Sequence, residues 1–145
     1  MIRIPQCKLS FCVETDDSSF ASFTPSSTYI LSSTLSSALR IYNIHTSKVL
    51  KTLKAPTQFI SEKYPCPALL FPALPSEGVS TDAWVVSGSE NGKIVLWELS
   101  SRRVAQLLEG HKTPVVALAV SPDGRTLATG SLEPESSIQI WHDDS

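Results

Sequence analysis

A threefold internal repeat runs through this chain of 145 residues. Each copy contains an apolar run closed by an aromatic residue, at 38–43, 93–98 and 137–142. Each of these is preceded by a run that ends in small, mostly hydroxyl-bearing residues, at 30–34, 85–89 and 127–131. Further upstream, each copy has an apolar stretch ending in proline, and the prolines are 47 and 50 residues apart: Pro25, Pro72 and Pro122. A period of roughly 40 to 50 residues kept over three copies indicates a repeat architecture.

Each copy is expected to form several short β-strands. The runs are rich in β-branched and aromatic residues and are bounded by turn signals such as Ser121-Pro122-Asp123-Gly124 and Glu90-Asn91-Gly92. A run that can form a fourth strand follows in two copies, at 48–53 and 102–108. Four antiparallel strands in a unit of this length make one blade of a β-propeller. The expected fold class is all-β, with about three four-stranded antiparallel blades.

Three blades form an incomplete ring, because closed propellers have about 4 to 8. We therefore expect one partial propeller over residues 1–145, with blades at about 13–54, 62–109 and 112–145. Residues 1–12 could supply an outer strand to a neighbouring blade through residues 6–12. The chain is interpreted as the C-terminal part of a seven-bladed protein, and self-assembly of open three-blade units is the alternative.

The third copy resembles the WD repeat, because it has Gly110-His111, then Thr129-Gly130-Ser131, and Trp141 as its closing aromatic. In that family a histidine, a serine or threonine, an aspartate and the tryptophan form a buried hydrogen-bonded chain. The resemblance thus gives a structural role to His111, to Thr129 or Ser131, and to Trp141, with Trp97 as the matching aromatic of the middle copy.

All three copies depart from the family pattern. In the third copy the aspartate position falls near Glu133 or Glu135, inside a two-residue insertion. In the middle copy Ala55-Pro56 replaces Gly-His and Asn91 stands where aspartate is usual. The first copy ends in Tyr42-Asn43 rather than Trp-Asp.

The chain is also similar to the last three blades of the propeller subunit of COMPASS-type histone lysine methyltransferase complexes, over stretches at 23–31, 48–53, 61–64 and 131–141. This resemblance implies a non-catalytic scaffold whose partners are proteins, namely subunits of the methyltransferase complex and peptide segments. It also implies a nuclear location, with the cytoplasm as a second compartment. The alternative is another WD-repeat adaptor, such as a ubiquitin-ligase substrate receptor.

The same resemblance implies two candidate binding sites. A pocket at the channel mouth, which takes an arginine side chain in the resembled subunit, would be formed here by Ser19, Phe20, Cys66 and Val116, with Tyr64 at its rim. Ala68 stands where that subunit has an aromatic ring, so we expect weaker arginine binding. A groove for an acidic-hydrophobic segment would use Tyr29 and Ile41, although both could equally pack within the first blade.

The residues predict no enzyme, cofactor or metal site. His45, His111 and His142 lie in different copies, and Cys7 and Cys12 have no second cysteine pair at zinc spacing. An enzyme that used the channel would need a cluster of carboxylates, histidines or metal ligands that the sequence does not display. A net charge of −2 argues against direct nucleic-acid binding. No apolar run approaches the roughly 18 residues of a membrane span.

Overall fold

The computed structural model describes residues 17–24, 28–71 and 84–143, which form eleven strands in three antiparallel sheets. The first sheet has the order β1 (Ser18–Phe23), β2 (Tyr29–Thr34), β3 (Ala38–Asn43), β4 (Val49–Leu53). The second has the order β5 (Ala68–Phe71), β6 (Trp84–Gly88), β7 (Lys93–Glu98), β8 (Arg103–Glu109). The third contains β9 (Val115–Val120), β10 (Thr126–Ser131), β11 (Ile138–His142).

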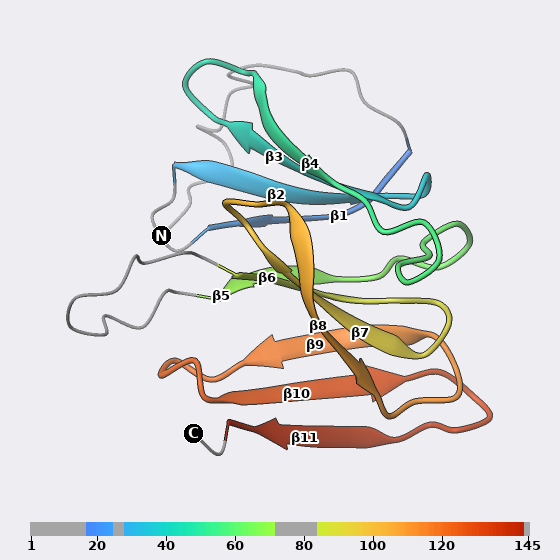
Figure 1. Cartoon of the computed structure of the whole chain (residues 1–145). Coiled ribbons are helices and arrows are strands. Elements are labelled where there is room, and N and C mark those ends of the chain that lie inside the picture. The colour runs from blue at the N-terminus through green and yellow to red at the C-terminus, as the bar shows by residue number, and fades with distance from the viewer. Residues whose placement is uncertain (1–16, 25–27, 72–83, 144–145) are drawn as a thin grey trace, which may run out of the picture.

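The three sheets lie one above another, in chain order, as Figure 1 shows. The all-β fold class predicted from the repeat is confirmed. The first and second sheets have the four strands expected of a blade, whereas the third has three among the described residues. Each sheet falls inside one of the three blade ranges, whose outer limits stay a prediction. The outer strand expected at residues 6–12 lies outside the described residues. Among the described residues, no helix is long and apolar enough to cross a membrane.

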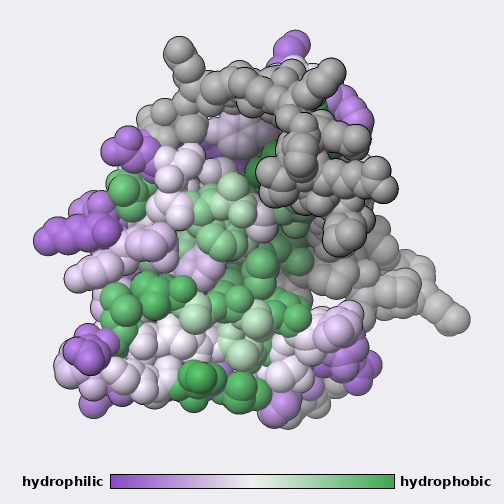
Figure 2. Space-filling model, turned by 180° about the vertical axis from the view of Figure 1, so that it is seen from behind, coloured by the Kyte–Doolittle hydropathy of each residue, from purple (hydrophilic) through white to green (hydrophobic). Residues whose placement is uncertain are grey.

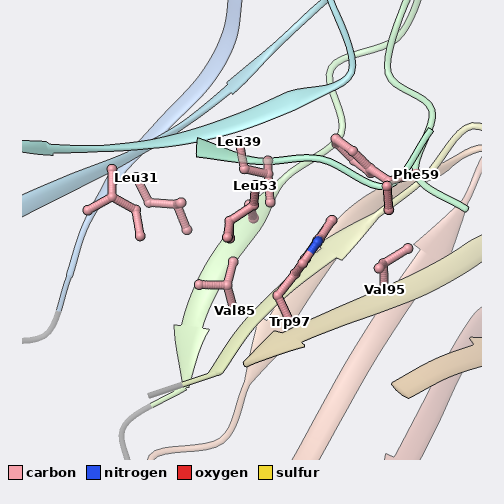
Figure 3. Packing of buried hydrophobic residues seen from close by; sticks show 10 residues of the cluster. Leu31, Leu39, Leu53, Phe59, Val85, Val95 and Trp97 are labelled. Carbon is pink, nitrogen blue, oxygen red and sulfur yellow. The ribbon is translucent and has the colours of Figure 1, made fainter. Parts of the chain in front are cut away.

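Alternation along the strands of the middle sheet sends its side chains to both neighbouring sheets. Val85, Val95 and Trp97 point to the first sheet and pack with Leu39 and Leu53 there (Figure 3). The opposite face carries Val86, Ile94 and Leu96, which pack against the third sheet at Val115 and Leu127. Because both faces are covered, β6 and β7 read as nearly continuous apolar runs.

Gly92 belongs to the middle sheet and lies against the start of the third unit. It adopts a left-handed conformation, with φ of 84°, in the turn between β6 and β7. A side chain there would also overlap the carbonyl oxygen of His111. Glycine is therefore required twice over at this position, by its conformation and by the close approach of the following unit.

The outward face of the third sheet is apolar and uncovered. Ile138 and Ile140 of β11 are 78% and 55% exposed. Across the sheet they pair with Gly130 and Ala128, and Ala128 pairs in turn with Ala119. In Figure 2, hydrophobic residues are exposed at the level of this sheet. The equivalent face of the middle sheet is covered by its neighbour, so this face resembles half of an inter-sheet interface.

We expect the isolated chain to self-associate through this face, because exposed apolar sheet surfaces drive association. The double substitution Ile138→Lys with Ile140→Lys should shift the protein towards the monomer in sedimentation velocity. Ala105→Lys, at an exposed position of β8, is the matched control and should leave the distribution unchanged. A wild-type chain that sediments as a single monomeric species would contradict this expectation.

Candidate functional site

A buried chain of hydrogen bonds crosses the third sheet. His111 Nε2 lies 2.7 Å from Thr129 Oγ1, and Trp141 Nε1 donates to the same oxygen at 3.0 Å. On the other side of the imidazole, His111 Nδ1 lies 2.8 Å from Glu135 Oε2. The structure thus brings together three of the residues singled out from the sequence, and of the two glutamates near the aspartate position it places Glu135 against the histidine.

The direction of the proton donors follows from the partners. An ionised Glu135 can only accept, so His111 Nδ1 carries the proton and donates to it. In the neutral imidazole Nε2 is then an acceptor, and the Thr129 hydroxyl donates to it while accepting from Trp141. Ser131 contributes at the edge of the chain, because its hydroxyl bonds to Glu135 and accepts from the Ser137 amide.

Glu135, His111 and Thr129 share the order of groups found in a hydrolase triad, an acid, a histidine and a hydroxyl. However, Thr129 is only 1% exposed, and Trp141 already occupies its oxygen as a donor. A nucleophile must reach substrate, and this hydroxyl is closed off by the sheet packing. The arrangement therefore holds β10, β11 and the segment before β9 together.

Thr129→Val keeps the side-chain volume and removes both hydrogen bonds of the hydroxyl. We expect a loss of about 1–3 kcal/mol in the free energy of unfolding, because His111 Nε2 and Trp141 Nε1 lose their partner. The measurement is urea denaturation. Ser87→Ala is the matched control at the equivalent position of the middle sheet. Its hydroxyl donates to the backbone carbonyls of Pro67 and Gly88, and the Pro67 carbonyl also accepts from the Gly88 amide, so the loss should be smaller. Equal losses would contradict the role assigned to Thr129.

The pKa of Glu135 is held below its ordinary value of 4.5, first by the Ser131 hydroxyl and further by His111. A carboxyl whose pKa is lowered by folding stabilises the protein above its unfolded pKa, and this contribution disappears as the pH falls. Glu135→Gln should therefore be less stable than wild type at pH 7, with the difference shrinking below pH 4.5. Urea denaturation across this range is the measurement, and a difference independent of pH would refute the expectation.

The middle sheet reaches the same architecture without this polar chain. Trp97 is completely buried, and its Nε1 has no hydrogen-bond partner among the residues that the structure describes. Phe59, which the sequence analysis did not single out, packs edge-on against its ring with centroids 5.3 Å apart. Ser87, the counterpart of Thr129, is directed to the carbonyls of Pro67 and Gly88. An aromatic contact thus takes the place of the histidine in this sheet.

The residues expected at the channel mouth lie at one end of the molecule. Strands β1, β5 and β9, which are the first strands of the three sheets and would be innermost in a propeller, run in the same direction in Figure 1. Their first residues therefore lie at the same end. Ser19 and Phe20 lie near the start of β1, Cys66 just before β5, and Val116 near the start of β9. Ser19, Phe20 and Val116 are half-buried.

Cys66 differs from the other residues expected at the channel mouth because it is completely buried. Desolvation raises the pKa of its thiol to about 12, despite a hydrogen bond from Ser61 that favours the thiolate. The thiol is therefore neutral and contributes packing. Ala68, two residues further on, is also completely buried, in the core between the first two sheets.

Tyr64 is 42% exposed, on a segment that we call the 61–66 loop. The loop is fixed by Glu90, whose Oε1 accepts hydrogen bonds from the backbone amides of Glu62, Lys63 and Tyr64. Burial opposes ionisation of this carboxyl, but the three amides outweigh it, so the pKa of Glu90 lies below its ordinary value. The sequence showed residue 90 only as part of a turn, because no local pattern links it to a loop 26 positions earlier.

The groove expected between the first two blades is closed at one of its two residues. Ile41 is 4% exposed and belongs to the core shared by the first and second sheets. Tyr29 is half-buried and packs against the same core. In this arrangement both residues serve the packing of the first sheet.

The remaining histidines do not join the chain around His111. His45 and His142 are exposed, and they belong to the first and third units. In the described parts of the chain, no group of three or more histidines, cysteines or acidic residues is placed to hold a metal ion.

Comparison with known proteins agrees with this architecture. Residues 102–142, which contain β8 and the whole third sheet, match the family model of the WD domain, G-beta repeat. The match covers one of the three repeat units, and the three stacked sheets of the structure are consistent with blades of this family. The relatives of the chain include a periodic tryptophan protein 2 homolog of Dictyostelium discoideum, 35% identical over 48% of this chain, and one of Mus musculus, 33% identical over 43%. The aligned part spans only 8% and 7% of the length of these relatives.

Proposed function

We propose that this chain is part of a WD-repeat propeller that acts as a non-catalytic scaffold for protein interactions. The observation that carries the proposal is the end of the molecule where the three innermost strands begin. It combines an exposed tyrosine, Tyr64, with the half-buried Phe20 on sheets that are rigidly packed. Rigid frames with exposed aromatic residues suit the binding of proteins and peptides.

The polar groups that could carry chemistry support the same proposal. His111 and Glu135 are engaged in the buried chain of the third sheet, and Glu90 is engaged in fixing the 61–66 loop. Each of these side chains thus has a structural partner. The enzyme alternative would need a reactive group open to substrate, and the buried Thr129 hydroxyl does not supply one.

The proposal is made at the level of WD-repeat scaffolds. The narrower expectation, a subunit of a histone lysine methyltransferase complex in the nucleus or also the cytoplasm, rests on the sequence resemblance alone. The relatives found are periodic tryptophan protein 2 homologs, and they give a methyltransferase complex no support. A ubiquitin-ligase substrate receptor belongs to the same class of adaptors, and no contact in the structure favours it.

For the partner we propose a peptide segment with an exposed arginine, bound near Ser19, Phe20 and Val116 with Tyr64 at the rim. Guanidinium groups stack on aromatic faces, and each such contact contributes about 0.5–2 kcal/mol. The resembled subunit has an aromatic ring at the position of Ala68. Here Ala68 faces the core, so this position supplies no ring to the site. We therefore expect binding weaker than micromolar.

The test is calorimetry of the full chain with short peptides that carry a central arginine, each compared with its lysine counterpart. Phe20→Ala should weaken arginine-peptide binding about tenfold, which corresponds to ~1.4 kcal/mol. Phe23→Ala removes the same side chain at the opposite end of β1, where it is exposed, and should have no effect. Submicromolar binding that Phe20→Ala leaves unchanged, or a complete absence of binding, would contradict the proposed site.

A further inference from the structure

Three consecutive backbone amides of the 61–66 loop converge on a single carboxylate oxygen, which belongs to Glu90. Glu90 Oε1 accepts from the amides of Glu62 at 2.9 Å and Tyr64 at 2.7 Å, and the amide of Lys63 lies between them. Successive N–H groups that face one point form a concave anion site. Here the anion is a side chain of the turn between β6 and β7.

The same loop is held from the first sheet. The Ser37 amide donates to the Ser61 carbonyl at 3.1 Å, and the Ser61 amide donates to Ser37 Oγ at 3.0 Å. Ser37 lies in the turn between β2 and β3, so the loop bridges turns of two sheets. Just before the loop, the Glu90 amide also donates to the carbonyl of Ile60 at 2.9 Å.

These contacts use the backbone of the loop and leave its side chains outside. Glu62, Lys63 and Tyr64 are exposed, although all three of their amides are bonded to Glu90. A loop ordered in this way loses less conformational freedom when a partner binds, and preorganisation of this kind favours affinity.

We propose that Glu90 is a positioning residue that fixes the 61–66 loop and thereby presents Tyr64, beside Lys63, to a peptide partner. The inference rests on the proposed function, because it assigns to Glu90 the ordering of the rim of that binding site. Glu90 itself touches no partner; it acts through the three amides.

Amide hydrogen exchange tests the ordering without any partner. Glu90→Ala should speed exchange at the amides of Glu62, Lys63 and Tyr64 by about tenfold or more, since their common acceptor is lost. Exchange at the core amides of Val86 and Leu96 should stay unchanged. Unchanged exchange in the loop would overturn the proposal, and so would equal acceleration in the core, which would show a general loss of stability.

Two further variants separate positioning from a merely structural effect. Glu90→Gln keeps an acceptor oxygen and should restore much of the protection in the loop. Glu98→Ala is the matched control: it removes another glutamate of the middle sheet, which accepts from the Ser101 hydroxyl, and should leave the loop as it is. Equal exchange in Glu90→Gln and Glu90→Ala would count against the role of the acceptor oxygen.

Calorimetry with the arginine peptides completes the test. Glu90→Ala should weaken binding about three- to tenfold, and combining it with Tyr64→Ala should weaken binding less than the two separate losses add up to. A loosened loop with unchanged affinity would overturn the positioning role. If the wild-type chain binds none of the peptides, the proposed function fails, and the exchange measurements still decide whether Glu90 fixes the loop.

Discussion

The middle sheet is packed on both faces, and the placement of both neighbouring sheets depends on that packing. Trp97 and Val85 fill one interface, while Val86 and Leu96 fill the other. Since side chains alternate along a strand, one pair of strands, β6 and β7, serves two cores. Burial of these apolar surfaces is the main favourable contribution to the free energy of folding. It also sets β1, β5 and β9, the first strands of the three sheets, side by side.

The closing tryptophans of the third and middle sheets are held in place by different interactions. In the third sheet Trp141 is tied into a polar chain with Thr129, His111 and Glu135. In the middle sheet Trp97 packs against Phe59 instead, and within the described part of the chain its Nε1 is unpaired. A buried polar network fixes geometry only when each member is satisfied, whereas apolar packing requires fit in shape alone. Repeats of one architecture can therefore lose the histidine and keep the fold.

Loops that bridge sheets connect this packing to the proposed binding end. Backbone amides of the 61–66 loop donate hydrogen bonds to Ser37 and Glu90 in the turns of the first and second sheets, so the shape of the loop depends on how those sheets stack. Cys66, the last residue of the loop, and Ala68 beyond it are completely buried, while Tyr64 remains accessible. The scaffold thereby separates residues that hold the sheets from those that can meet a partner.

The repeat of small hydroxyl residues and closing aromatics was enough to predict the strands and their antiparallel order, because strand periodicity and spacing are local properties of the chain. The partnership of His111, Thr129 and Trp141 was implied by the resemblance to the WD repeat. The choice of Glu135 over Glu133 was not available from spacing, since a two-residue insertion leaves the path of the turn open. Phe59 beside Trp97, and Glu90 beneath the 61–66 loop, were equally hidden. Each is a contact between segments roughly 25 to 40 positions apart, and such contacts exist only once the sheets have stacked and brought their turns together.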